Sequence, residues 1–299
     1  MDLRDCTICP RNCHVDRFAG QTGYCGQTNK IKAARASLHM WEEPCISGQT
    51  GSGTVFFSGC NMGCVFCQNH TISKGIIGRN ISSERLAEIF LELQEQKACN
   101  INLVTPTHFI PQIVEALKIA KNDGLSIPVV YNTSSYEKVE SLKYLEGLID
   151  IYLPDLKYLS PTLSKKYSRA EDYFAYAAPA IAEMVRQTGS PEFADDIMTK
   201  GVIVRHLALP GCMEDSKAVL RTLYEAYGDS IYISIMNQYT PLPDFLDTAQ
   251  FPELNHTVTS EEYEKLVDYA IELGIENGFI QEGETSSVSF IPPFDCDGI

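Results

Sequence analysis

The chain has 299 residues, and its 39 acidic residues outnumber 24 basic ones to give a formal net charge of −15. Such an acidic surface repels phosphate backbones and anionic headgroups, which disfavours nucleic acid and membrane as partners. No stretch approaches the ~20 apolar residues of a membrane span, and the start of the chain lacks the apolar core of a signal peptide. Eleven cysteines, an odd number in a large chain, favour metal binding in a reducing cytoplasm over a disulfide framework.

Short apolar runs alternate with helical patterns from residue 53 onward. The six expected strands are 54–58, 101–105, 128–132, 150–154, 201–209 and 231–236. Between them, apolar side chains recur at helical spacing, as in Leu86, Ile89, Phe90 and Leu93. Six such βα units predict a parallel sheet with right-handed crossovers, curled into a barrel or left open. Either architecture places ligands at the C-terminal ends of the strands.

Three segments lie outside this alternation. Residues 1–52 are rich in cysteine and glycine, and residues 163–200 leave room for two helices. Residues 237–259 form a proline-punctuated connection, which is expected to cover a binding site or to pack on the surface. We therefore divide the chain into an N-terminal segment, 1–52, with a candidate metal site, a βα region, 53–283, and a tail, 284–299.

Three cysteines directly follow the first expected strand with the spacing C-x3-C-x2-C. They are Cys60, Cys64 and Cys67. Thiolates are the natural ligands of iron–sulfur clusters, and three of them leave one iron of a [4Fe–4S] cluster open to a small molecule. The alternative is a structural zinc ion with His70 as its fourth ligand. The spacing alone leaves both open.

The stretch GCNMGCVFCQN resembles the signature of the radical S-adenosylmethionine (SAM) superfamily, with Phe66 at the aromatic position before the last cysteine. Together with LVTPTHFIPQI, YLPDLKY and ISIMNQYTPL, it is similar to pyruvate formate-lyase activating enzyme-like proteins over about residues 6–283. The resemblance implies an α/β fold: a partial (βα)6 TIM-like barrel behind a cysteine-rich N-terminal extension. It also implies that the three cysteines hold a [4Fe–4S] cluster whose open iron binds SAM.

The same resemblance implies a reaction. An electron donor such as flavodoxin or ferredoxin reduces the cluster, and SAM is cleaved to methionine and a 5′-deoxyadenosyl radical that abstracts hydrogen from a substrate. In the activase version of this hypothesis, the substrate is the glycine backbone of a glycyl-radical enzyme. The alternatives are a small-molecule or peptide substrate and, outside enzymes, an iron–sulfur electron carrier or a zinc-stabilised binding protein.

Further candidates sit at the ends of the other strands. Family members commonly carry Gly-Gly-Glu after the second strand, where this chain has Thr105-Pro106-Thr107-His108. Thr107 either contacts SAM or caps the helix that follows. The expected cofactor-binding residues are Phe66, Thr105, Thr107, Asn132, Ser134, Asp155, Lys157 and Gln238, and the expected catalytic residues are Arg205 and His108.

Arg205 stands inside an apolar strand, where a charge is costly unless it points into a paired, solvated site. His206 is expected on the opposite face as a buried histidine with a hydrogen-bond partner. The Asp155 and Lys157 charges are either ligand contacts or ordinary strand-end charges, and Tyr239 contacts a ligand or simply packs.

A second group of thiols lies near the start of the chain with the spacing C-x2-C-x3-C-x11-C. Its members are Cys6, Cys9, Cys13 and Cys25. Four thiols among glycine-rich turns suggest structural zinc or an auxiliary cluster, and the alternative is free cysteines. The remaining thiols are expected to be unpaired: Cys45, Cys99, Cys212 and Cys296.

Overall fold

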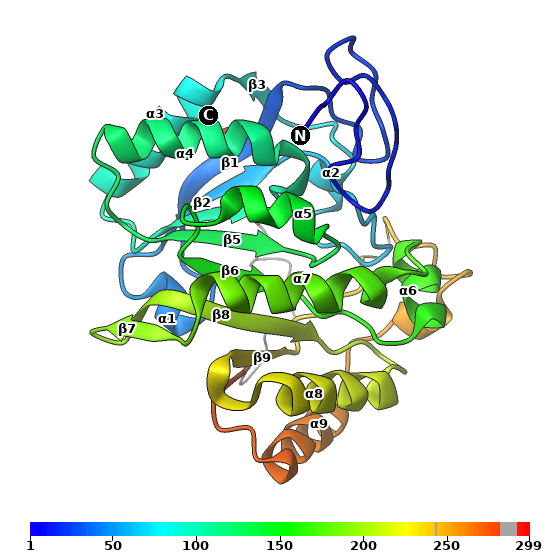
Figure 1. Cartoon of the computed structure of the whole chain (residues 1–299). Coiled ribbons are helices and arrows are strands. Elements are labelled where there is room, and N and C mark those ends of the chain that lie inside the picture. Colours follow the sequence, from blue (N-terminus) through cyan, green and yellow to red (C-terminus); the bar gives the residue numbers. More distant parts are fainter. Residues whose placement is uncertain (243, 282–291) are drawn as a thin grey trace.

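The computed structural model describes residues 1–242, 244–281 and 292–299, and within these ranges ten strands form one curved, open sheet (Figure 1). The sheet order is β10-β9-β8-β6-β5-β4-β2-β1-β3, with β7 paired to β8. The strands from β10 to β2 run parallel, and β1, β3 and β7 are antiparallel to their neighbours. This confirms the expected α/β fold with a partial barrel.

The parallel strands include all six that the sequence predicts, with β10 in addition. They are β2 (Ser52–Phe57), β4 (Ile101–Val104), β5 (Val129–Thr133), β6 (Ile151–Pro154), β8 (Ile197–Leu207), β9 (Tyr232–Met236) and β10 (Gly278–Ile280). The antiparallel strands are β1 (Ile31–His39), β3 (Arg79–Ile81) and β7 (Glu192–Ala194). Strand β8 begins earlier than expected because its first residues form a hairpin with β7.

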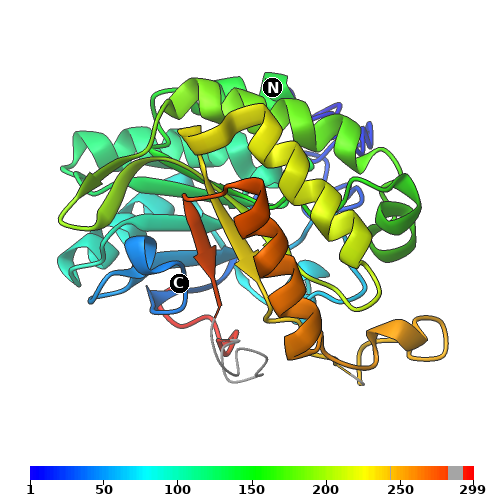
Figure 2. The same cartoon turned by 90° about the horizontal axis from the view of Figure 1, so that it is seen from below.

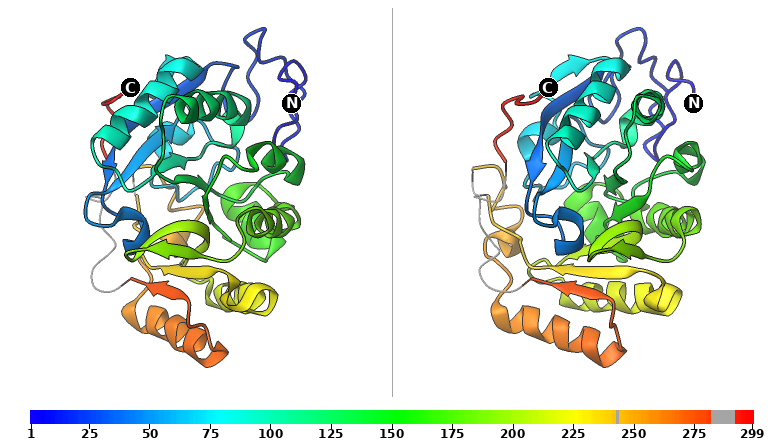
Figure 3. Two further views of the ribbon diagram at one scale, coloured as in Figure 1. Left: turned by 60° about the vertical axis from the view of Figure 1, so that its left-hand side comes forward. Right: turned by 90° about the vertical axis from the view of Figure 1, so that its left-hand side faces the viewer.

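Helices on the outer face of the sheet cover it from one edge to the other (Figure 3). The longer ones are α3 (Ser83–Glu95), α4 (Ile110–Asn122), α6 (Pro161–Ser168), α7 (Tyr173–Thr188), α8 (Met213–Tyr227) and α9 (Ser260–Leu273). The chain also has short helices that are not all on this face, namely α1 (Pro44–Ser47), α2 (His70–Ser73) and α5 (Val139–Leu142). As expected, two helices, α6 and α7, occupy the long connection before β8. Figure 2 shows α8 and α9 side by side at the edge of the sheet that β10 forms.

Local sequence signals fix the ends of these helices. The side chain of Ser82 accepts a hydrogen bond from the backbone N–H of Arg85 at the start of α3. Thr259 and Glu262 cap α9 reciprocally. Gly124 follows α4 with a φ of +106°, a conformation that glycine adopts at no steric cost.

Side chains on the strands alternate between two cores. Leu103, Tyr131 and Tyr152 belong to the core between sheet and helices. Val130 and Ile151, their chain neighbours, belong to a second cluster inside the barrel, which α1 closes at one end with Cys45 and Ile46. Burial of both faces explains why the strands read as continuous apolar runs.

The N-terminal segment contributes a strand to the sheet, and the C-terminal tail forms hydrogen bonds with that strand; the sequence predicts neither. β1 lies within the N-terminal segment and pairs with β2, so the boundary expected at residue 52 separates two hydrogen-bonded strands. In the tail, the backbone N–H of Cys296 donates to Ala34 in β1. Arg35 of β1 pairs with Asp295 and Asp297. The first part of the expected tail, 284–291, lies outside the described residues, as do 282 and 283 of the βα region.

Candidate functional site

The three-cysteine loop connects β2 to α2 at the C-terminal ends of the parallel strands. In Figure 1 this end of the sheet faces the N-terminal segment, α2 and α6, whereas α1 and β7 lie at the opposite end. Gly59 begins the loop with a φ of +89°. A Cβ atom there would lie 2.5 Å from the backbone oxygen of Cys25. The loop therefore needs glycine both for its turn and for its close contact with the N-terminal segment.

Each of the three thiols accepts a hydrogen bond. Cys60 Sγ accepts from the backbone N–H of Met62 at 3.3 Å, and Cys67 Sγ accepts from that of Asn69. Cys64 Sγ accepts from the hydroxyl of Ser168 at 3.0 Å. Such bonds favour the thiolate form, which is the form that binds iron.

Burial works against ionisation in this loop. It raises the pKa of Cys67 to about 12, and repulsion from Cys64 and Cys60 adds to the shift. Burial also raises the pKa of Cys64, although Lys157 opposes this by stabilising the thiolate. Three thiols this close repel one another as thiolates, and a bound cationic centre would replace their protons. The donor set therefore fits an iron–sulfur cluster.

A preformed ligand set does not distinguish zinc from a cluster at this loop. Within the described ranges, no three Cys, His, Asp or Glu side chains converge as a preformed ligand set for one ion. His70, the fourth ligand of the zinc alternative, stacks its ring on Phe245 at 4.2 Å between centroids.

Aromatic side chains pack against the loop. Phe66 is buried and makes edge contacts with Tyr167 and Tyr239, each at 6.4 Å between ring centroids. The hydroxyl of Tyr167 donates to Glu253 at 2.6 Å. Tyr239 and Glu253 both come from the 237–259 connection, so the described part of that segment covers the loop. Tyr239 therefore packs against another aromatic side chain, and the ring of Phe66 contacts the rings of Tyr167 and Tyr239.

An ion pair lies beside Cys64 at the end of β6. Lys157 Nζ is 2.5 Å from Asp155 Oδ2, and both side chains are largely buried. Burial favours the neutral amine, but Asp155 and Cys64 outweigh it and raise the pKa of Lys157 above its ordinary value. The hydroxyl of Tyr173 binds the backbone oxygens of Ser134 and Asp155, both at 2.8 Å, and thereby joins the ends of β5 and β6. The two predicted charges thus form one paired group at the mouth of the sheet.

The two threonines in the segment after β4, Thr105 and Thr107, differ from expectation in their backbone conformation and hydrogen bonding. Thr105 has a φ of +58°, which is a strained conformation for a β-branched residue. Thr107 donates its hydroxyl to Glu137 Oε1 at 2.6 Å and does not cap the following helix. Glu137 is fully buried and also accepts from Tyr131 and Thr133. Sequence reasoning missed this carboxyl group.

His108, which the sequence predicts to be catalytic, lies in the interior beside the end of β2. Its side chain is completely buried, and its Nε2–H donates to the backbone oxygen of Ser58 at 2.8 Å. Burial, aided by the nearby Arg17 guanidinium, lowers the pKa of His108 to about 3. The neutral ring holds the end of β2 against the turn after β4, so it acts as a structural link.

Arg205 is likewise paired inside the protein. Its guanidinium contacts both Glu42 and Glu43, with Nε 2.8 Å from Glu43 Oε1. Asn102 donates to Glu42 Oε1 at 2.8 Å, and a side-chain hydrogen bond from Ser234 supports Glu43. Burial opposes ionisation of Glu43, but Arg205 outweighs it and lowers the pKa of this carboxyl. The expectation that Arg205 points into a site with a charged partner holds, but that partner comes from the chain itself.

The remaining candidates lie at the expected edge of the sheet. Asn132 is partly buried in β5 beside Val104 and Leu153 of the neighbouring strands. The backbone oxygen of Gln238 accepts from Gln68 at 2.7 Å, which ties the end of β9 to the cysteine loop. His206 is buried with Nδ1 2.8 Å from the backbone oxygen of Leu156.

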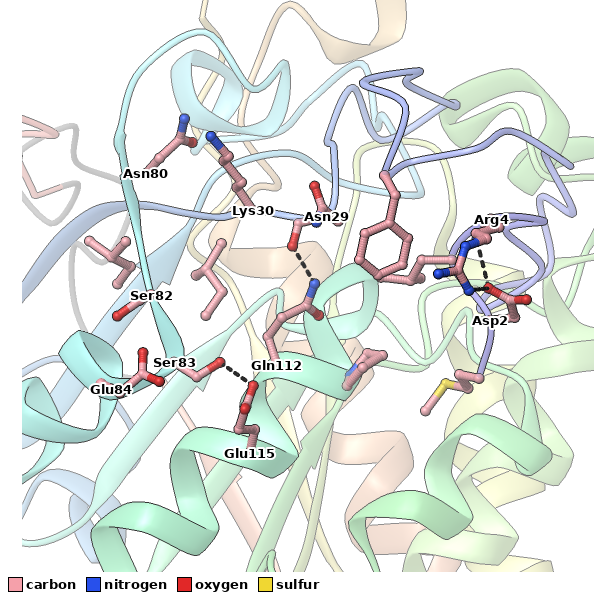
Figure 4. Close-up of a pocket in the computed structure, with 16 residues that line it drawn as sticks. Asp2, Arg4, Asn29, Lys30, Asn80, Ser82, Ser83, Glu84, Gln112 and Glu115 are labelled. Atoms are coloured by element: carbon pink, nitrogen blue, oxygen red, sulfur yellow. Dashed lines mark hydrogen bonds and ion pairs between the residues drawn. The ribbon is translucent and has the colours of Figure 1, made fainter.

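A separate surface pocket of about 970 Å³ lies away from this site (Figure 4). It is bounded by the first residues of the chain, by β3 and by the starts of α3 and α4. Within it, Gln112 donates to the backbone oxygen of Asn29 at 2.5 Å, and Ser83 donates to Glu115 at 2.7 Å. None of the candidate site residues lines it.

Comparisons with known proteins agree with this geometry. A model of the radical SAM superfamily matches residues 54–201. The chain is 28% identical to the uncharacterized protein MJ0674 of Methanocaldococcus jannaschii over 280 residues, which cover 90% of this chain and 75% of that protein. Residues 54–201 of this chain therefore form a radical SAM domain, and enzymes of this superfamily use a [4Fe–4S] cluster and SAM.

Solved structures share the fold. SuiB of Streptococcus suis bound to its precursor peptide SuiA matches with a TM-score of 0.52 and 13% identity, over 76% of this chain and 47% of SuiB. SuiB bound to SAM matches with a TM-score of 0.50 and 15% identity, over 76% and 49%. The chain thus spans about half the length of SuiB. Among the helices in the described ranges, none is both long and apolar enough to cross a bilayer.

Proposed function

We propose that Cys60, Cys64 and Cys67 hold the [4Fe–4S] cluster and that the chain abstracts hydrogen from a glycine residue of a partner glycyl-radical enzyme. The observation that carries the cluster assignment is the loop itself. Three hydrogen-bonded thiols stand at the C-terminal mouth of a parallel sheet, and the loop sequence offers no fourth cysteine. Ligands bind at this end of such sheets.

Bound there, the reduced cluster supplies the electron that cleaves SAM to methionine and a 5′-deoxyadenosyl radical. The protein positions the reactants and excludes water. Lys157 stabilises the thiolate of Cys64, and Asp155 keeps that ammonium in place. Thr105 and Asn132 present polar groups at the same edge of the sheet, where SAM would lie. The packed aromatic group of Phe66, Tyr167 and Tyr239 shields the loop from solvent.

The activase assignment is supported by the four stretches that resemble pyruvate formate-lyase activating enzyme-like proteins. The step is balanced: the glycine Cα–H bond breaks, its hydrogen atom forms 5′-deoxyadenosine, and a glycyl radical remains on the partner. The alternative substrates are a peptide or a small molecule.

The test uses full-length protein, reconstituted anaerobically and reduced with dithionite, with SAM and pyruvate formate-lyase labelled with α-deuterated glycine. With unlabelled pyruvate formate-lyase we expect an EPR doublet from the glycyl radical, because its remaining α-hydrogen splits the signal. With the deuterated partner we expect that doublet to collapse and deuterium to appear in the 5′-deoxyadenosine. Production of unlabelled 5′-deoxyadenosine without a doublet would contradict the activase assignment and favour a different substrate, while leaving the cluster assignment intact.

A further inference from the structure

The N-terminal segment folds into tight turns that carry four cysteines. The backbone N–H of Cys6 donates to Val15, and that of His14 donates back to Cys6, so the two stretches run side by side. A further turn closes with a bond from Asn12 N–H to the backbone oxygen of Cys9. Cys6 and Cys9 are each only 7% exposed, although they belong to a segment without regular secondary structure.

The four thiols lie close enough to influence one another. Burial raises the pKa of Cys9 to about 12, and repulsion from Cys25 and Cys13 contributes. Burial also raises the pKa of Cys25, with contributions from Cys6 and Cys13. At Gly23, a Cβ atom would lie 2.6 Å from Cys13 Sγ, so the chain needs glycine to bring its backbone against this sulfur.

Backbone amides point at these sulfurs as they do in the Cys60–Cys67 loop. Cys9 accepts from the N–H of Arg11, two residues on, and Cys25 accepts from that of Gln27, also two residues on. Cys13 Sγ accepts from the N–H of Tyr24 at 3.3 Å. Cys60 and Met62 show the same two-residue arrangement in the radical SAM loop. Hydrogen bonds to sulfur favour the thiolate, which is the metal-binding form.

A buried cation beside these thiols contacts carbonyl oxygens, a sulfur atom and the ring of Phe109. Arg17 is 1% exposed, and its guanidinium donates to the backbone oxygens of Thr28 and His108. Its Nη1 also lies 4.0 Å from Cys6 Sγ. No carboxylate in the described ranges forms an ion pair with it. Because an uncompensated buried charge is costly, a negative charge near Cys6 Sγ would stabilise this guanidinium.

We propose that Cys6, Cys9, Cys13 and Cys25 form a tetrathiolate metal site whose negative charge is partly offset by Arg17. Binding of Zn²⁺ releases four thiol protons and leaves a complex of charge −2, and a four-cysteine [4Fe–4S] cluster is likewise anionic. As with the first loop, the thiols are not yet a converged ligand set in the described residues. Metal binding therefore requires their side chains to rotate toward one another on the turns that carry them.

The proposed metal site would also help to order the loop that carries Cys60, Cys64 and Cys67. Arg11 Nε donates to the backbone oxygen of Asn61 at 2.8 Å, and the Tyr24 hydroxyl donates to that of Met62 at 3.0 Å. The Arg11 guanidinium lies over the Tyr24 ring, 3.9 Å from its centroid. Both anchoring residues are within two positions of a proposed ligand, so ordering the N-terminal turns orders the loop that holds Cys60.

The first test removes the other cluster. Full-length protein with Cys60, Cys64 and Cys67 all replaced by alanine is purified anaerobically and analysed for zinc, iron and sulfide. We expect about one zinc, or about four iron with matching sulfide, per chain. Either result supports the tetrathiolate site and identifies its metal. A folded, metal-free chain would overturn the proposal, and it would say nothing against SAM cleavage by the parent protein.

The second test assigns the ligands. Adding Cys13→Ala and Cys25→Ala should remove the remaining metal, whereas adding Cys99→Ala, at the opposite end of the sheet, should not. Should the five-fold variant fail to fold, thiol alkylation of the native parent replaces it. Cys13 and Cys25 are partly exposed, as is Cys99. We expect the first two to resist alkylation until a chelator is added, and equal labelling of all three before chelation would refute the site.

Discussion

The Arg205 cluster yields a prediction that separates a structural role from a catalytic one. Replacing Arg205 with methionine keeps the length and apolar stem of the side chain but removes the only cation that the structure places against Glu42 and Glu43 within the described residues. Glu43 is 7% exposed, so it cannot recover its charge stabilisation from water. It must therefore become neutral or remain as an uncompensated buried anion.

Protonation sets the upper limit of this cost. A carboxyl group with an ordinary pKa near 4.3 that is forced to be neutral at pH 7 costs about 3.7 kcal/mol, and at pH 5 about 1 kcal/mol. In the parent, Arg205 lowers the pKa of Glu43, so the group stays ionised at both pH values. In the variant its pKa is raised in the folded state, so stability falls as the pH rises. Between pH 5 and pH 7, the free energy of unfolding of the variant should therefore fall by about 2.7 kcal/mol more than that of the parent.

Urea unfolding of both proteins under anaerobic, reducing conditions measures this difference. Adding Glu42→Gln and Glu43→Gln to the Arg205→Met variant removes both carboxyl groups that face Arg205 and should abolish the pH dependence. A destabilisation below about 1 kcal/mol at pH 7, or one that is equal at both pH values, would refute the buried ion cluster. Loss of SAM cleavage without loss of stability would favour the catalytic role expected from the sequence.

Three other perturbations follow from the site. Burial raises the pKa of Glu137 to about 7. Between about pH 4.5 and 7 the folded state therefore binds more protons than the unfolded state, and the free energy of unfolding falls by about 3 kcal/mol as the pH rises. Glu137→Gln should remove this pH dependence from urea-unfolding measurements. Thr105→Gly should raise stability by about 1 kcal/mol by relieving its strained backbone but slow SAM cleavage. Lys97→Gly, just beyond the C-terminal end of α3 and at a φ of +70°, should change stability alone. Gly59→Ala should lower the unfolding temperature and the iron content, because its Cβ would collide with the backbone of Cys25; an unchanged iron content would contradict the close docking of the two cysteine segments.

Elements with strong local patterns were predictable from the sequence. The six strands between residues 53 and 237 are apolar on both faces, and α3 carries both its stripe and its Ser82 cap. The three-cysteine loop was located because its spacing is local and it directly follows a strand. β1 was missed because its sequence, IKAARASLH, mixes alanine with basic residues and lacks a clear alternation.

The partners of the candidate residues were not predictable, because they come from distant parts of the chain. Glu43 meets Arg205 across 162 positions, and Thr107 meets Glu137 across 30. The sequence predicts that Arg205 points into a site with a charged partner, but it does not show that the chain supplies the anion. A glutamate pair directly before a helix-starting proline, Pro44, was the only available signal, and such pairs are common on surfaces. The burial that keeps the His108 ring neutral likewise depends on contacts that the local sequence does not specify.

The most direct test of the central claim compares two single variants of the full-length protein. Parent, Cys60→Ala and Cys99→Ala are reconstituted anaerobically with iron and sulfide, reduced with dithionite and given SAM, and 5′-deoxyadenosine is quantified by mass spectrometry. The account predicts that the parent and Cys99→Ala form 5′-deoxyadenosine with matching methionine and that Cys60→Ala forms neither. Equal cleavage by Cys60→Ala, or no cleavage by a fully reconstituted parent, would contradict it.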